Sequence, residues 1–455
     1  NVVNLGDGKN EMKAGYRIAK YIFGASGGNR ASYAGNTLNV KASAQAKNIV
    51  NFDKVNFYFT DTLQPRLTLR DSTGTKFKSL KDIAIYGSPS TPAGTLIENN
   101  TSGGIVVRDG VNTLVRTGDT AEVTLERDAT GRKILYSRLI FKGAATAESD
   151  GTGTWGGRSV IGNTTTDNAI TVQAGTHTNI YGGWTTGTGS EASDKGASKK
   201  NSVTVSGTAT VTGTVYGGFT DAAGGKATEN TVTVEKAIGS SVVGGQAAGD
   251  AVGNKVKVMA NVGAVAGGKS TGAAASSNTV EVGSDDRSIA TGAVTGGTGA
   301  TSSSGNTVKL TRTTVTGDVV GGNGASANSN TLHLDRTTVA GDVIGGRGGA
   351  ASDNTVAIDR TIATGVITGG TANGTGNTLN VKGTNTAKNI AGFQKLKFEA
   401  DTAAAGKAML TLSNGETTLA DKDLIEVSGS AAHGKVTALG TRAKNAIAAF
   451  LELMD

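Results

Sequence analysis

Two short glycine-containing motifs in this sequence have the spacing of loops that bind nucleotides or hold a nucleophile. Residues 263–270 read GAVAGGKS, which fits the phosphate-binding pattern of Gly, four residues and then Gly-Lys-Ser. In nucleotide-binding proteins this loop joins a strand to a helix whose N-terminus holds the phosphate. Here the Gly-Gly pair belongs to a periodic series and TGAAASSNTV leads on to another strand pattern. We therefore predict no nucleotide site.

The second motif lies at residues 24–28, GASGG, and has the G-x-S-x-G spacing of a hydrolase nucleophile. That chemistry needs a strand-to-helix elbow and a histidine base. The sequence contains only His177, His333 and His433; His333 lies in a variable column of a repeat, and the other two have polar or glycine-rich neighbours. Because no polar constellation converges around these residues, we predict that the protein has no catalytic site, is not an enzyme and needs no cofactor.

Charged residues recur at a fixed spacing in the second half of the chain. Arg312, Arg336 and Arg360 are 24 residues apart, and Asp335 and Asp359 precede two of them. Two interpretations remain open: a solvated, salt-bridged row, or a surface that binds anionic glycans. Metal sites are not expected. The segments that contain two of the Gly-Gly pairs, 320–328 and 344–352, lack the aspartate of calcium-binding nonapeptide repeats, and there is no Cys.

The elements that position these residues follow from an internal repeat. An Asn recurs with a basic period of 24 residues, at Asn168, Asn201, Asn230, Asn254, Asn278, Asn306, Asn330, Asn354 and Asn377. The second and fourth residues after each Asn are always aliphatic, whereas the residue between them varies. This alternation predicts a half-buried strand in every repeat, with Val308 and Leu310 inward and Lys309 outward.

The repeated Asn shares the inward phase of the aliphatic residues. Stacked one coil above the next, these amides can hydrogen-bond to one another and to the backbone along the stacking axis. We therefore predict a structural ladder whose regular members are Asn230, Asn254, Asn278, Asn306, Asn330, Asn354 and Asn377.

A Gly-Gly pair preceded by an aliphatic residue marks a second strand in each repeat. The inward column is Ile180, Val215, Val242, Val265, Val294, Val319, Val343 and Ile367. The next column, which includes Val320, is expected to point outward. Glycines adopt positive φ at little steric cost, so we expect the pair to turn the chain. Together the two strands predict an all-β β-solenoid with coils of about 24 residues.

A larger unit occurs twice and suggests the domain limits. Residues 35–59 and 376–400 share 14 of 25 residues. We expect an N-terminal segment 1–21 that fits no coil and could supply a pairing strand, an N-terminal coil with an irregular β module at 22–150, the repeat solenoid at 151–382, and a capping module at 383–455. Residues 441–455 place apolar side chains on one face of a short terminal helix.

Composition limits the class of protein. Of 455 residues, 36% are hydrophobic and 4% aromatic, which suits a thin repetitive core. The net charge of +7 is spread along the chain without a Lys/Arg-rich run, so nucleic acid is not an expected partner. No run of 18 apolar residues predicts a membrane span. Because the sequence begins at Asn1, either a signal peptide has been removed or the sequence is a fragment.

The N-T-V-x-V units, the V-x-G-G segments and the K-N-I-x-x-F-x-K-L-x-F segment together resemble passenger regions of Gram-negative autotransporters and related adhesin-type surface proteins. The resemblance covers about residues 20–60 and 155–430 and implies secretion, a β-solenoid passenger, and adhesion, aggregation or surface coating. We expect an extracellular, self-assembling fibre or surface-layer subunit whose main partner is itself, head to tail. The alternative is an adhesin passenger that binds a cell-surface glycan or protein receptor.

Overall fold

The computed structural model contains 54% strand and 2% helix, and its stacked parallel coils form a β-solenoid of about 14 turns. The predicted fold class is therefore confirmed. The structure describes residues 2–5, 16–17, 20–24, 35–60, 63–109, 112–116, 120–160, 162–187, 196–371, 373–402, 404, 407–414 and 424–429. These residues form two compact units, unit 1 up to Ile140 and unit 2 from Phe141. The predicted terminal helix and His433 lie outside the described residues.

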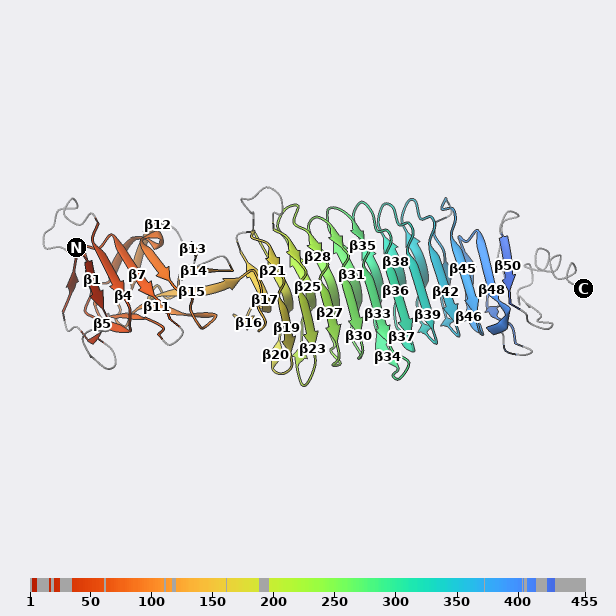
Figure 1. Cartoon of the computed structure of the whole chain (residues 1–455), viewed down its shortest axis with the longest axis horizontal. Coiled ribbons are helices and arrows are strands. Elements are labelled where there is room, and N and C mark those ends of the chain that lie inside the picture. The colour runs from red at the N-terminus through yellow and green to blue at the C-terminus, as the bar shows by residue number, and fades with distance from the viewer. Residues whose placement is uncertain are drawn as a thin grey trace, which may run out of the picture. The chain divides into compact units, whose positions relative to one another are not determined.

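In unit 2, each Asn of the repeat immediately precedes a strand of one long sheet, here called the asparagine sheet (Figure 1). Its strands are parallel and pair in register, so Val308 lies between Val280 and Leu332. In order they are β19 (Ala169–Val172), β23 (Ser202–Val205), β27 (Thr231–Val234), β30 (Lys255–Val258), β33 (Thr279–Gly283), β36 (Thr307–Thr311), β39 (Thr331–Asp335), β42 (Thr355–Asp359), β45 (Thr378–Lys382), β48 (Lys395–Glu399) and β50 (Leu424–Ser428).

The Gly-Gly segments form the second long sheet of unit 2, here called the glycine sheet. Its first strand pairs antiparallel and the others pair parallel. The strands are β16 (Glu148–Ser149), β17 (Thr154–Ser159), β21 (Ile180–Thr185), β25 (Val215–Thr220), β28 (Val242–Ala247), β31 (Val265–Ser270), β35 (Val294–Thr298), β38 (Val319–Asn323), β41 (Val343–Arg347), β44 (Val366–Thr368) and β47 (Asn389–Ala391).

Short strands lie between the two long sheets in many of the coils. One set precedes the asparagine strands: β18 (Thr165–Thr166), β22 (Ser198–Lys199), β26 (Ala227–Thr228), β29 (Ala251–Val252) and β32 (Ala275–Ser276). The other set follows them: β20 (Thr176–His177) with β24 (Thr210–Val211), then β34 (Ile289–Thr291), β37 (Thr313–Val315), β40 (Thr338–Val339), β43 (Ile362–Ala363), β46 (Asn385–Ala387) and β49 (Leu410–Leu412). The short helix η3 (Ala400–Thr402) follows β48.

The core of unit 2 is a continuous column of aliphatic side chains from both long sheets. Val308, Leu310 and Val319 are completely buried and Lys309 is exposed, as the strand phase predicts. Val320, which was expected to point outward, is nevertheless buried, at 4% exposure. Val320 is not part of the core cluster. It lies in register between Thr295 of the preceding coil and Ile344 of the following coil.

The Gly-Gly pairs are not turns, which corrects the expectation drawn from the sequence. Seven of the eight pairs lie inside strands of the glycine sheet, as in β25, whereas Gly369 and Gly370 follow β44; none of these glycines has a positive φ. Their role is to leave space: a Cβ at Gly217 would lie 2.4 Å from the carbonyl oxygen of Gly244 in the next coil. A Cβ at Gly218 would lie 2.3 Å from the amide nitrogen of Asn230. The glycines therefore admit close packing of coils and of the Asn side chains.

Unit 1 is also built from parallel coils, with an antiparallel addition. One sheet contains β1 (Val2–Leu5), β4 (Thr37–Val40), β7 (Lys54–Tyr58) and β10 (Ile83–Tyr86). A second contains β2 (Tyr16–Arg17), β5 (Ala44–Ala46), β8 (Leu67–Leu69), β11 (Ala93–Asn99), β15 (Lys133–Ile140), β14 (Ala121–Arg127) and β13 (Asn112–Arg116). Two pairs complete it, β3 (Ile22–Phe23) with β6 (Ile49–Val50) and β9 (Thr75–Ser79) with β12 (Ile105–Asp109), beside η2 (Leu80–Asp82).

The described strands of the N-terminal segment, β1 and β2, do fit the coil pattern, contrary to expectation. Strand β1 pairs parallel with β4, β2 with β5, and β3 with β6, so these three strands form one coil beneath the next. The sequence hid this coil because the spacing between its strands differs from the 24-residue repeat.

The module detected in the sequence has the same pairing in both units. Thr37 lies opposite Lys54 in unit 1, and Thr378 lies opposite Lys395 in unit 2. The strands that follow also correspond, because β8 pairs with β5 as β49 pairs with β46. The duplication is therefore one of coil geometry as well as of sequence.

Candidate functional site

The repeated Asn side chains lie inside unit 2 in one continuous hydrogen-bonded column. All nine are at most 1% exposed. Each amide nitrogen donates to the side-chain oxygen of the next Asn, over 3.0 Å from Asn306 to Asn330 and 3.1 Å from Asn330 to Asn354. The backbone N–H of Asn306 donates to the same oxygen of Asn330, also over 3.0 Å. Every rung is thus tied to its neighbour twice, by side chain and by backbone.

Other groups satisfy the remaining amide hydrogens and the two ends of the column. The side-chain nitrogen of Asn330 also donates to the carbonyl of Ser303 at 3.0 Å. At the first rung, the backbone N–H of Ala144 donates to Asn168 at 2.8 Å. At the last, the N–H of Asn377 donates to the side-chain oxygen of Gln394 at 3.0 Å. Gln394 thus takes the place of a further Asn, which the sequence spacing did not reveal.

The residue before each ladder Asn adopts a left-handed backbone conformation. These residues are Asp167, Lys200, Glu229, Gly253, Ser277, Gly305, Ser329, Asp353 and Gly376, with φ between 55° and 73°. A sharp corner at this point turns the chain from a short strand into the asparagine sheet. Gly occupies it in three coils because glycine alone adopts this φ without strain.

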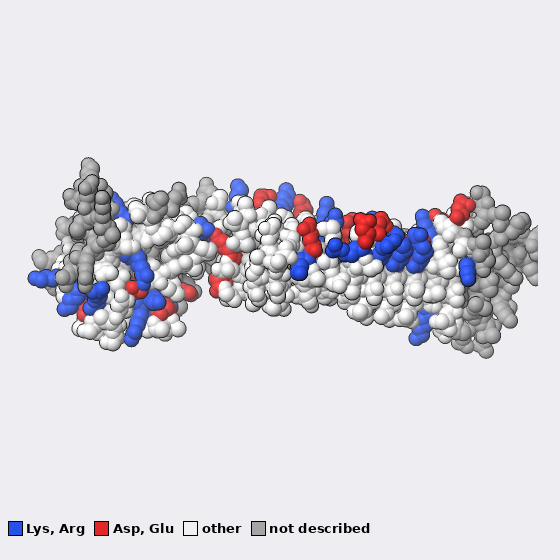
Figure 2. Space-filling view, turned by 90° about the horizontal axis from the view of Figure 1, so that it is seen from below, with Lys and Arg blue, Asp and Glu red and all other residues white. Residues whose placement is uncertain are grey.

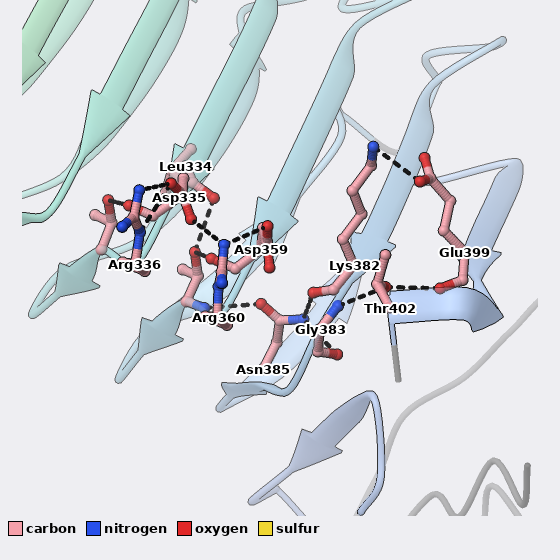
Figure 3. Close-up of polar contacts among 12 residues, drawn as sticks. Leu334, Asp335, Arg336, Asp359, Arg360, Lys382, Gly383, Asn385, Glu399 and Thr402 are labelled. Atoms are coloured by element: carbon pink, nitrogen blue, oxygen red, sulfur yellow. Dashed lines mark hydrogen bonds and ion pairs between the residues drawn. The ribbon is translucent and has the colours of Figure 1, made fainter. Parts of the chain in front are cut away.

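The arginine row lies at another corner, where the chain leaves the asparagine sheet (Figure 3). Arg336 donates from Nε to Asp335 over 3.0 Å and from Nη2 over 2.6 Å, and it also pairs with Asp285. Arg360 donates from Nη2 to Asp335 over 3.0 Å and to Asp359 over 2.9 Å. Two members of the row are therefore salt-bridged, and Asp335 joins them.

Arg312, the first arginine of the row in the sequence, differs from Arg336 and Arg360 in its contacts. Arg312 follows Thr311, which lies in register with Asp335 of the next coil, so no aspartate precedes it. Its side chain is exposed and makes no hydrogen bond or ion pair with any residue that the structure describes. Arg312, Arg336 and Arg360 share the same backbone conformation, with φ 49° in each.

The charged side chains around this corner shift the pKa values of Asp335 and His333. Burial alone would raise the pKa of Asp335, but hydrogen bonds and positive charge from Arg336 and Arg360 lower it, so the carboxylate stays ionised. Burial and the charges of Lys309 and Lys382 lower the pKa of His333. On the face of unit 2 drawn in Figure 2, charged side chains gather in one band and most of the remaining surface is uncharged.

A cluster of aromatic side chains, which no repeat in the sequence indicated, lies on the first coils of the glycine sheet. Tyr181 stacks on Trp184 at 4.5 Å and on Tyr216 at 5.1 Å between ring centroids. The guanidinium of Arg158 lies 4.7 Å from the ring of Trp155 and 4.2 Å from that of Trp184. These rings therefore pack on one another across strands β17, β21 and β25.

The motifs that resembled catalytic loops are not brought together with partner groups in the described parts of the chain. Lys269 of the GAVAGGKS segment is exposed on strand β31, and Ser26 lies outside the described residues. His177 bonds to Thr154 at 2.8 Å. Within the described ranges, no three His, Asp or Glu side chains gather as metal ligands would, and no helix has the length and apolar character to cross a bilayer.

Comparison with known proteins finds no matching family model, no similar curated protein and no similar solved structure.

Proposed function

We propose that this protein is an extracellular structural protein, a solenoid subunit that assembles head to tail into a fibre or surface layer. The observation that carries this proposal is the coil module that occurs in both units with the same strand pairing. A protein that contains the same stacking module near both ends of its described chain has related surfaces with which successive copies can continue the stack.

The strands that flank the two modules, β1 and β50, favour stacking of one copy on the next in the head-to-tail direction. Val2 to Leu5 lie against β4 as Thr355 to Ile358 lie against β45, so the module in unit 1 accepts a neighbouring coil strand in the usual way. At β50, Val427 continues the inward column of Val381 and Phe398 but is 41% exposed. Covering such an apolar column with the first coil of another copy would favour association through the hydrophobic effect.

An extracellular location agrees with the absence of Cys and with the resemblance to autotransporter and adhesin passengers. A stack whose strands obtain their hydrogen bonds from neighbouring coils suits a surface coat, because copies can extend it coil by coil.

Assembly is tested by negative-stain electron microscopy and analytical ultracentrifugation of the purified chain over a range of concentrations. We expect filaments, or a concentration-dependent series of oligomers. Val427→Asp should abolish them, because a charge in the exposed column cannot be buried by a second copy without cost. Val106→Asp is the matched control, since Val106 is 44% exposed on β12 and belongs to neither module.

A wild-type chain that stays monomeric at every concentration would contradict the proposal. Filaments of normal length from Val427→Asp would contradict the role of β50 while leaving assembly by another surface.

A further inference from the structure

The corner that carries the arginine row has a backbone suited to glycine. Asp359 lies in register with Lys382, so Arg360 and Gly383 are equivalent residues of successive coils. Gly383 has φ 61° and Arg360 has φ 49°, both in the left-handed region. The fold therefore accepts glycine at this corner, and an arginine is not needed to form it.

The backbone strain of arginine at this corner is larger than the stabilisation that its observed ion pairs contribute. A left-handed conformation costs a residue with a side chain about 1–2 kcal/mol. An exposed ion pair contributes about 0–1 kcal/mol, which offsets part of this cost at Arg336 and Arg360. Arg312 has the same φ of 49° and no ion pair with any described residue, so folding stability does not explain its presence.

The surroundings of Arg312 contain both signs of charge: Glu281 of the preceding coil lies in register with Lys309, and Asp285 pairs with Arg336. Lys309 is exposed three residues earlier on β36, and no ion pair joins it to a described residue. Arg360 contacts both of its aspartates through Nη2 alone, so its other guanidinium nitrogens remain as donors. The row runs along the stacking direction with one arginine per coil, at the spacing of neighbouring strands of about 4.8 Å.

We propose that Arg312 and Lys309 bind an oxyanion group of a linear acidic glycan, and that Arg336 and Arg360 extend this contact along the solenoid axis. The guanidinium fork of Arg312 would hold a sulfate or carboxylate with two parallel hydrogen bonds, and the Lys309 ammonium would add a point charge. Asp335 and Asp359 orient the neighbouring arginines. Because their carboxylates repel anions, they limit the site to ligands whose negative groups are separated from one another along the chain. This binding site goes beyond assembly and does not depend on it.

The test measures binding of the full chain to immobilised heparin, a sulfated glycan, and to polygalacturonate, a carboxylated one, with neutral dextran as the reference. We expect binding to at least one acidic glycan, little to dextran, and a decline with rising salt. Which acidic glycan binds identifies the oxyanion. Arg312→Gly should weaken binding by about tenfold, the effect of losing one charge-assisted contact. Arg312→Lys should retain more of the affinity.

The decisive readout is the Tm measured on the same variants. Arg312→Gly should raise the Tm while it weakens binding, since glycine relieves the left-handed strain; a merely structural arginine would lower the Tm when removed. Lys309→Ala should weaken binding without changing the Tm. Lys269→Ala removes an equally exposed charge from the glycine sheet and should change neither. Absence of binding to both acidic glycans, equal binding to dextran, or a lower Tm with unchanged binding in Arg312→Gly would overturn the proposal.

Discussion

A ladder Asn takes part in more hydrogen bonds than a side chain at the surface could keep. The oxygen of Asn330 accepts from the backbone and the side chain of Asn306, while its nitrogen donates to Ser303 and Asn354. Because all these groups are buried, removing one side chain leaves several donors and acceptors without water or protein partners. The column therefore couples each coil to the next.

Replacement of Asn330 by Ala should lower the free energy of unfolding by about 3 kcal/mol, since each buried group left unpaired costs about 1–3 kcal/mol. Denaturant unfolding followed by circular dichroism measures this change. Asn380→Ala is the control, because Asn380 is an outward residue of β45 whose side-chain oxygen has no hydrogen-bond partner in the described structure. Equal losses in the two variants would contradict a special role for the ladder.

The left-handed residue before each ladder Asn is strained wherever it is not glycine. Ser329 is exposed with φ 56°, and its equivalent one coil earlier is Gly305 with φ 66°. Ser329→Gly should stabilise the protein by up to about 1 kcal/mol, because relief of strain exceeds the added freedom of the unfolded chain. The reciprocal change Gly305→Ser should destabilise it. Thermal unfolding of both variants is the measurement, and shifts of the same sign would refute the explanation.

At the scale of the element, the two long sheets depend on each other through the glycine pairs. The glycine pairs lie against the Asn column. Because they have no side chains, neighbouring coils can stack closely and the Asn amides can pack against the backbone of the glycine sheet. The periodic Asn and the periodic Gly-Gly are therefore two halves of one packing arrangement.

Gly217→Ala should destabilise the solenoid by about 1–3 kcal/mol or more, because its Cβ would meet a backbone oxygen that cannot move away without separating two coils. Gly239→Ala is the matched control: a Cβ there meets nothing within 4 Å, and the residue is exposed. Chemical denaturation of the two variants compares them directly. A Gly217→Ala protein as stable as Gly239→Ala would show that the coils tolerate a wider separation.

At the scale of the whole molecule, the two units differ in how they bury polar groups. The repeated coils of unit 2 bury a column of neutral amides, whereas a buried site of unit 1 centres on a carboxylate: Asp71 is 1% exposed and accepts from Thr73 and Asn48. The backbone hydrogen bond from Thr73 and side-chain hydrogen bonds, opposed by burial, lower the pKa of Asp71 to about 2 from its usual 3.8.

Unit 1 should consequently lose stability in acid. A lowered folded-state pKa means that this contribution is complete above pH 3.8 and disappears as the pH falls from there to about 2. Hydrogen exchange at pH 5 and pH 2.5 should show a loss of protection in β8 and β9 that Asp71→Asn makes independent of pH. Unchanged protection of these strands in the wild-type protein at pH 2.5 would contradict the prediction.

The sequence by itself determined the all-β solenoid, the phase of the asparagine strands and the duplicated module. It could do so because parallel coils that stack in register place equivalent residues in columns, and a column of buried aliphatic side chains leaves a periodic trace. Tertiary structure alone decided the rest. Most of the Gly-Gly pairs lie in strands because the opposing Asn column needs their space, and Val320 is covered by neighbours from other coils. Strand β1 joins a coil through partners distant in sequence, and the structure alone shows that Arg312 makes no ion pair with any described residue while Arg336 and Arg360 do. Such contacts join separate coils, and the period of one strand contains no information about them.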